Sequence, residues 1–327
     1  MAGPRDEFID EKYCIQYPRR SPDNSAINMQ IGLQTALQDT STASVSHLWR
    51  MADRLGFGWV SGWDHFGGVG GGHNNLDGVV MHTLAAVETS RARVGSLTYC
   101  VDYRPLAVIA KTIATIDQLS AGRATLGLGA GYLEAEYHRW GYEFDPPSIR
   151  LKRLEEMVAA LRLLFSGHPT DFVGSHFTLR SAVCDPTPIQ SHLPIWIGGG
   201  GEQRTIPLAA RIADGWNVPM IDPVAFARKC RLLDKELESN RRARTDIERS
   251  VNVGLCWDEN SIDDVYGARA DVLRPAILTG SNDRVLSVLE QYRSAGADWV
   301  MISMRAPFDF DAIERFAQEV LPLVGPS

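Results

Sequence analysis

The segment Val94–Tyr132 constrains the fold of this chain more than any other stretch. Residues 94–100 are rich in strand formers, and residues 106–116 carry apolar side chains at helical spacing. Residues 124–128 are short enough for a buried parallel strand. A helix that connects two strands in this way places them parallel in one sheet. The second strand ends at Gly129-Ala130-Gly131, where backbone N–H groups can approach a ligand closely.

The alternation of strands and helices continues along all 327 residues, a length typical of an α/β barrel. Short runs of strand formers alternate with segments of helical periodicity. We therefore predict an α/β protein with a (β/α)8 TIM-barrel fold, and a doubly wound sheet is the alternative. The eight strands are expected at residues 27–35, 57–63, 94–100, 124–128, 194–197, 215–218, 250–257 and 298–304.

The barrel is expected to be a single domain from residue 27 to residue 327. Residues 1–26 hold many charges and three prolines, so we interpret them as an irregular N-terminal arm outside the fold. A long amphipathic helix and the alternating residues 176–179 fall within about residues 141–192. We interpret that segment as an insertion that carries a hairpin or lid.

Composition argues against several classes of partner and site. A net charge of −7 is unlike a nucleic-acid-binding surface, and no apolar run is long enough to span a bilayer. The charged, proline-broken N-terminal residues do not resemble a secretory signal. The five cysteines are scattered and never form a CxxC motif, which is typical of reduced thiols in a cytoplasmic protein without a structural metal site.

Several chemically distinctive segments fall at the carboxyl ends of predicted strands. In a barrel these ends meet at one rim, where ligands bind. The coincidence is the strongest argument from the residues for a small-molecule site. The segments are Asp64-His65, Ser96–Cys100, Gly127–Gly131 and Gly198–Gly201.

His65 is the leading acid–base candidate, because imidazole titrates near neutral pH and Asp64 adjoins it. The alternative is that Asp64 caps the next turn while His65 packs in the core. The two glycine clusters can bind phosphate or carboxylate through backbone N–H groups. Their alternative is ordinary tight turns, because a partial GxGxG pattern alone is a weak signal.

Three segments together resemble the bacterial luciferase-like superfamily, and most closely its branch that uses the deazaflavin coenzyme F420. The resemblance covers about residues 27–305, and three motifs in the same order are more specific than any single glycine pattern. The segments are GFGWVSGWDHF at Gly56–Phe66, the run from Val94 to Gly141, and LPIWIGGGGEQRTIPLAARIADGWN at Leu193–Asn217.

The resemblance implies a (β/α)8 barrel with an insertion, which forms a homodimer and binds F420. Asp64 would lie beside the deazaflavin ring, and His65 would serve near the hydride-transfer centre as proton donor or acceptor. The peptide bond Ser96–Leu97 would be the family's non-proline cis bond, in a bulge that supports one face of the ring. The cofactor's ribityl-phosphate tail would follow Gly129, Ala130 and Gly131, and its phosphate would lie at Gly198, Gly199, Gly200 and Gly201.

The chain departs from the sugar-phosphate dehydrogenases of that branch. They have a glutamate after the glycine turn and a tryptophan shortly after the histidine, where this chain has Tyr132 and Val69. No basic cluster for a substrate phosphate is evident in the sequence. We therefore expect a larger or less charged substrate. The candidates to line its pocket are Trp63, Tyr99, Tyr103 and Trp216, and the alternative for each is a place in the core.

Three functions follow as hypotheses. The first is an F420-dependent oxidoreductase that moves a hydride between deazaflavin C5 and an organic small molecule, with His65 handling the proton. The second is a luciferase-like monooxygenase that uses reduced FMN and oxygen. The third is a cofactor-binding protein of the same fold without turnover.

Overall fold

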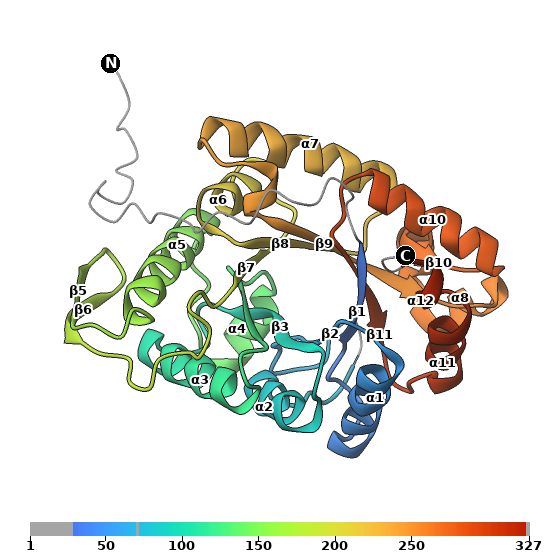
Figure 1. Cartoon of the computed structure of the whole chain (residues 1–327), viewed down its shortest axis with the longest axis horizontal. Helices are drawn as coiled ribbons and strands as arrows, with labels where there is room; N and C mark the ends of the chain where they lie inside the picture. The colour runs from blue at the N-terminus through green and yellow to red at the C-terminus, as the bar shows by residue number, and fades with distance from the viewer. Residues whose placement is uncertain (1–28, 70–71, 325–327) are drawn as a thin grey trace.

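The computed structural model describes residues 29–69 and 72–324 and shows a closed ring of parallel strands surrounded by helices (Figure 1). Neighbouring strands pair in the order β1-β2-β3-β4-β7-β8-β9-β11, and β11 pairs with β1 to close the ring. The (β/α)8 barrel is confirmed, and closure excludes the doubly wound sheet. The strands are β1 Gln30–Thr35, β2 Trp59–Gly62, β3 Arg93–Cys100, β4 Ala124–Gly129, β7 Ile195–Gly198, β8 Gly215–Pro219, β9 Glu248–Leu255 and β11 Trp299–Met304.

Helices between the strands bury their apolar faces on the outside of the barrel. Their ends follow local chemistry. Ser41 caps the first helix by accepting a hydrogen bond from Ser44 N–H, and Gly56 ends that helix at a φ of 97°. The helices are α1 Thr42–Leu55, α2 Gly78–Glu88, α3 Leu106–Leu119, α4 Glu134–Trp140, α5 Pro147–Leu164, α6 Thr205–Ile212, α7 Pro223–Ser239, α8 Ile262–Tyr266, α9 Ala270–Leu273, α10 Asn282–Ser294, α11 Phe310–Glu319 and α12 Leu321–Val324.

Bulky side chains fill the barrel interior at the amino-terminal ends of the strands. Trp59 and Trp299 begin β2 and β11, and Trp59 contacts both Trp196 and Trp299 edge-on, with ring centroids 4.9 and 5.4 Å apart. Glycines on adjacent strands provide the space. A Cβ at Gly215 would lie 2.1 Å from the Trp196 ring, and one at Gly95 would lie 2.9 Å from Trp59 Nε1. This layer of side chains fills the barrel at the amino-terminal ends of the strands. Space for a site is therefore left at the carboxyl-terminal ends.

The insertion contains α5 and an antiparallel hairpin, β5 Thr170–Val173 and β6 Thr178–Ala182. The hairpin lies beside α5 at the outer edge of the molecule (Figure 1). Glu156 of α5 fastens its turn by accepting hydrogen bonds from the backbone N–H groups of Ser175 and His176, at 2.9 and 2.8 Å. The predicted hairpin is therefore present, attached to an outer helix.

The segment between β9 and α10 was not predicted as structured. It contains the short helices α8 and α9, three 3₁₀ turns, and a two-residue strand, β10 Ile277–Leu278, which pairs with β9. No helix among the described residues is long and apolar enough to cross a membrane. The predicted N-terminal arm, residues 1–26, lies outside the described residues.

Candidate active site

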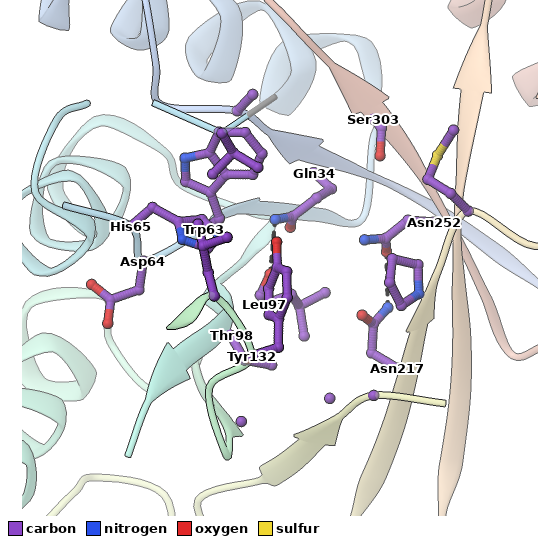
Figure 2. Close-up of a pocket in the computed structure, with 18 of the residues that line it drawn as sticks. Gln34, Trp63, Asp64, His65, Leu97, Thr98, Tyr132, Asn217, Asn252 and Ser303 are labelled. Atoms are coloured by element: carbon purple, nitrogen blue, oxygen red, sulfur yellow. Dashed lines mark hydrogen bonds between the residues drawn. The ribbon is translucent and has the colours of Figure 1, made fainter. Parts of the chain in front are cut away.

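A cavity of about 600 Å³ opens at the carboxyl ends of the barrel strands. Side chains from β1, β8, β9 and β11 form its floor, and the loops after β2, β4 and β7 form its wall (Figure 2). No residue of the described segment 141–192 lines it, so the inserted hairpin is not a lid over this cavity. Of the predicted site residues, the cavity is lined by Asp64, His65, Leu97, Gly129, Ala130, Gly131, Gly198, Gly199 and Gly200.

Two predicted site residues lie outside the cavity lining. Ser96 is fully buried in β3, and its hydroxyl has no hydrogen-bond partner among the described residues. Gly201 lies at the start of the turn into α6, where a Cβ would be 2.8 Å from Thr205 Oγ1. Gly201 therefore supports the turn, while the three preceding glycines face the cavity.

His65 is paired with a carboxylate that the sequence did not reveal. Its Nδ1 lies 2.8 Å from Glu136 Oε2, and the side chains are 13% and 4% exposed. Glu136 also accepts hydrogen bonds from the Tyr103 hydroxyl at 2.7 Å and from the backbone N–H groups of Phe66 and Gly67 at 2.6 and 3.0 Å. With Nδ1 engaged by a carboxylate, Nε2 is the ring nitrogen left for the cavity.

The contacts of Glu136 keep its carboxyl ionised. Burial alone raises the pKa of Glu136, but the hydrogen bonds from His65, Tyr103 and Gly67 outweigh burial and lower the pKa to about 2. At neutral pH the group is therefore a fixed carboxylate. It orients the His65 ring through the contact with Nδ1.

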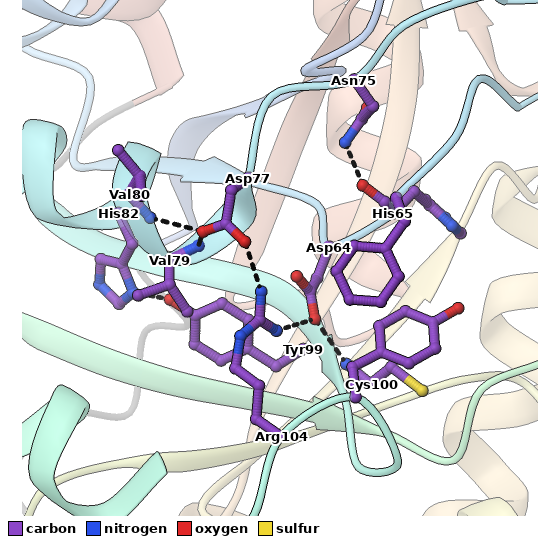
Figure 3. A network of polar contacts seen from close by, with 12 residues as sticks. Asp64, His65, Asn75, Asp77, Val79, Val80, His82, Tyr99, Cys100 and Arg104 are labelled. Atoms are coloured by element: carbon purple, nitrogen blue, oxygen red, sulfur yellow. Dashed lines mark hydrogen bonds and ion pairs between the residues drawn. The ribbon is translucent and has the colours of Figure 1, made fainter. Parts of the chain in front are cut away.

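Asp64 lines the cavity, but its carboxylate is turned toward an ion-pair network (Figure 3). Oδ2 accepts hydrogen bonds from Arg104 at 2.7 Å and from Cys100 N–H at 3.1 Å. Arg104 also binds Asp77, which caps α2. Burial raises the pKa of the Asp64 carboxyl, and the hydrogen bond from Arg104 opposes that rise. The geometry gives Asp64 a role in positioning the loop after β2, and its predicted place beside a ring stays a prediction.

The same loop is held from its other side by Asn75. Asn75 Oδ1 accepts the Trp63 indole N–H at 2.7 Å, and the Asn75 amide donates to the His65 carbonyl. The Trp63 and His65 rings contact edge-on, with centroids 5.2 Å apart. His65 is therefore fixed through its backbone, through its ring nitrogen and through a neighbouring aromatic side chain.

The non-proline cis peptide bond is one residue later than expected. It joins Leu97 to Thr98, so its assignment to Ser96–Leu97 was wrong. The bond lies in a bulge, because β3 takes three steps from Ser96 to Tyr99 where the paired strand β4 takes two. Gln34 Nε2 donates to the Leu97 carbonyl at 2.9 Å and holds this bulge toward the cavity (Figure 2).

Both predicted glycine turns meet the bulge at Thr98. A Cβ at Gly129 would lie 2.6 Å from Thr98 Oγ1, and one at Gly198 would lie 2.6 Å from Thr98 Cγ2. Neither glycine has a positive φ, so close approach is the reason that a side chain is excluded here. The turns after β4 and β7 and the bulge of β3 thus form one continuous surface.

Two asparagines form a polar part of the cavity floor (Figure 2). Asn217 Nδ2 donates to Ser250 Oγ at 2.7 Å and to Asn252 Oδ1 at 2.8 Å. Both donors of Asn217 are therefore used. Asn217 Oδ1 and Asn252 Nδ2 stay free among the described residues and present an adjacent acceptor and donor to a ligand.

Two of the four predicted aromatic lining residues are present in the cavity. Trp63 and Tyr103 line it. The prediction was wrong for Tyr99 and Trp216, which are both fully buried in the core. Tyr99 binds His82 Nδ1 at 2.7 Å, and Trp216 stacks on Phe226.

The structure also gathers cationic side chains that were not recognised in the sequence. Arg269, between α8 and α9, and Arg305, directly after β11, both line the cavity. They are 36 positions apart in the chain, which is why no cluster was evident. A charged residue directly after the last barrel strand was the available signal for Arg305.

Comparison with known proteins assigns this barrel to a family. Residues 25–298 match the family described as luciferase-like monooxygenase. This chain belongs to the luciferase-like monooxygenase family. The match spans most of the chain and includes both glycine turns and the Asp64-His65 step, so the resemblance seen in the sequence is confirmed.

Relatives in the family include F420-dependent enzymes. An F420-dependent glucose-6-phosphate dehydrogenase from Kineococcus radiotolerans is 32% identical over 179 residues, which are 54% of this chain and 52% of that protein. A 5,10-methylenetetrahydromethanopterin reductase from Archaeoglobus fulgidus is 27% identical over 259 residues, or 79% of this chain and 73% of the reductase. The chain spans about half the length of the curated relatives that it matches at 32% to 33% identity.

Solved structures of several enzymes share the fold. An F420-dependent secondary alcohol dehydrogenase in complex with an F420-acetone adduct superimposes with a TM-score of 0.81 at 18% identity, covering 91% of this chain and 100% of the dehydrogenase. The oxygenating constituent of 3,6-diketocamphane monooxygenase from Pseudomonas putida, in complex with FMN, gives 0.75 at 14% identity, covering 90% and 98%. At these identities the likeness concerns the fold alone.

Proposed function

We propose that this luciferase-like protein is an F420-dependent oxidoreductase that acts on an organic small molecule. The observation that carries the proposal is the pairing of His65 with Glu136 at the wall of a cavity that also contains the Leu97–Thr98 bulge. A histidine fixed by an ionised carboxylate is suited to taking and returning a proton. The F420-dependent relatives favour a deazaflavin as the partner in that chemistry.

The residues of the cavity fit a flat cofactor with a phosphorylated tail. The bulge at Leu97 and Thr98 supplies an apolar surface for a ring, and the free acceptor of Asn217 and donor of Asn252 suit the polar edge of a heterocycle. Gly129 and Gly198 keep the backbone bare where any Cβ would strike Thr98. Backbone N–H groups in such turns suit a phosphate.

In the proposed reaction, the protein's own residues transfer the proton. When bound, the deazaflavin accepts or donates a hydride at its C5. As an alcohol substrate loses its carbon-bound hydride, His65 Nε2 takes the hydroxyl proton, and the carbonyl product leaves; carbonyl reduction runs the same proton transfer in reverse. Glu136 holds His65 Nδ1–H and stabilises the imidazolium that forms.

Titration of the purified full chain with oxidised F420, reduced F420 and FMN tests the proposal. We expect F420 to bind in the micromolar range and FMN to bind more weakly. The absorbance of F420 then reports turnover with a panel of alcohols and ketones. Micromolar binding of FMN without binding of F420 would reject the proposal.

An FMN-dependent monooxygenase is the second candidate, because the FMN complex of the Pseudomonas putida enzyme has the same barrel. Oxygen consumption with supplied reduced FMN separates the two functions. The oxidoreductase proposal predicts only the spontaneous oxidation of FMN, equal with and without protein. Binding of F420 without turnover of any panel member, unchanged in His65→Ala, would instead favour a protein that only binds the cofactor.

A further inference from the structure

Two arginines meet at the cavity on a different part of the rim from the glycine turns. Arg269 follows β9 and Arg305 follows β11, and these strands are neighbours in the barrel. The glycine turns follow β4 and β7, which pair with each other. Strand β8 separates the two sectors on one side, and β1, β2 and β3 separate them on the other. The arginines therefore lie apart from the turns suited to the cofactor's phosphate.

Neither guanidinium has a carboxylate partner among residues 29–69 and 72–324. Burial and the neighbouring Arg269 lower the pKa of Arg305, and the other groups that influence it are the phenols of Tyr266 and Tyr132. Arginine nevertheless stays protonated in proteins. Arg305 is partly buried, whereas Arg269 is exposed. A partly buried cation beside a second cation is unfavourable unless an anion joins them. Arg104, another arginine with a largely buried side chain, has such anions in Asp64 and Asp77.

Aromatic contacts connect Arg305 to the proposed reaction centre. Its Cζ lies 5.9 Å from the centroid of the Trp63 ring, and Trp63 contacts the His65 ring. Tyr132 contacts His65 from another direction, with ring centroids 5.8 Å apart. The Trp63 ring thus lies between the guanidinium and the imidazole, and all three side chains line the same cavity, where one small substrate can contact both Arg305 and His65.

We propose that Arg269 and Arg305 form a subsite for an oxyanion group, such as a carboxylate, on the substrate. This inference rests on the proposed function, because it takes His65 as the reacting end of the cavity. It replaces the expectation of a less charged substrate. Met304 and Leu273 line the same part of the cavity, so we expect a substrate that combines an anionic end with an apolar body.

Benzoate and benzamide are matched probes, because they share their size and ring while only benzoate carries a charge. Calorimetric titration of the full chain without cofactor is expected to show roughly 10- to 100-fold tighter binding of benzoate, as charge-assisted hydrogen bonds predict. Arg305→Gln and Arg269→Gln should each remove most of that preference, and Arg305→Lys should keep part of it. The control is Arg284→Gln, whose exposed side chain pairs with Glu259 at 3.0 Å outside the cavity.

Equal affinities for the two probes, no benzoate binding, or an intact preference in both glutamine variants would overturn the subsite. F420 affinity is measured on the same variants and should be unchanged. A parallel loss of F420 affinity would show that the arginines hold the cofactor's phosphate instead, and would also overturn it. If benzoate is preferred but F420 does not bind wild type, the subsite stands and the proposed function fails.

Discussion

At the scale of single residues, the candidate site depends on a histidine whose hydrogen bonds leave it one free nitrogen. The Glu136 carboxylate makes four hydrogen bonds, with His65, Tyr103, Phe66 and Gly67, and together they fix its orientation. A carboxylate that cannot turn away holds the imidazole in one tautomer. Glu136 therefore determines which ring nitrogen of His65 is left to exchange a proton with a substrate.

Replacing His65 tests that assignment. His65→Ala should lower kcat about 10²- to 10⁴-fold, the usual contribution of a general acid or base. Glu136→Gln should lower kcat by a smaller factor, because the proton carrier stays but loses its orientation. Single-turnover oxidation or reduction of F420, followed by absorbance, measures both. His138→Ala, an exposed position on the same helix as Glu136, is the control, and a wild-type rate in His65→Ala would contradict the assignment.

Glu136 also predicts a pH dependence of stability. Its pKa is about 2 in the folded protein, against an ordinary value of 4.5. A lowered folded pKa stabilises the fold fully above the ordinary value, and the contribution disappears as the pH falls from about 4.5 to about 2. The free energy of unfolding of wild type should therefore fall more steeply over this range than that of Glu136→Gln.

Chemical denaturation at a series of pH values measures this difference. The control is Glu134→Gln, at an exposed position on α4 two residues before Glu136, and its pH profile should match that of wild type. Parallel pH profiles for wild type and Glu136→Gln would contradict the hydrogen-bonded, ionised state of Glu136.

The sequence indicated His65 but did not reveal its partner, Glu136, and the reason is physical. Glu136 lies 71 positions from His65, on a helix that follows a different strand, so only the closed barrel brings them together. The signal that was present is a glutamate beside Tyr137 on the buried face of a short helix, because an acidic side chain there needs a partner.

At the scale of elements, three segments of the chain, one strand bulge and two turns, meet at one threonine. The bulge of β3 carries Thr98, and the turns after β4 and β7 approach it through Gly129 and Gly198. The sequence predicted each turn separately from its glycines. The family resemblance implied a bulge in β3, but the residues of the strand did not locate it, because an extra residue in a buried strand changes its apolar character too little to detect.

A double-mutant cycle tests the contact. Gly198→Ala should destabilise the fold by about 1–3 kcal/mol through overpacking against Thr98. In the double variant with Thr98→Ala most of that cost should disappear, because the nearest remaining atom of residue 98, its Cβ, lies 3.5 Å from the added methyl group. Denaturant unfolding of the four proteins gives the coupling. Additive effects, or a Gly198→Ala variant as stable as wild type, would contradict the packing.

At the scale of the whole molecule, the eight barrel strands were all predictable because each is a short run of strand formers set off from segments of helical periodicity. The segment between β9 and α10 was not, since helices of four or five residues have no readable periodicity. That segment supplies Arg269, so the cationic side of the cavity was missed along with it. The homodimer implied by the family resemblance stays a prediction.

A structure of the protein with oxidised F420 tests the central claim most directly. We expect the deazaflavin ring to lie against Leu97 and Thr98, with the cofactor's phosphate at the turns after β4 and β7. His65 Nε2 would then face the substrate space on the ring's open side. A ring bound away from the Leu97–Thr98 bulge, or a His65 side chain separated from the ring by the wall of the cavity, would contradict it.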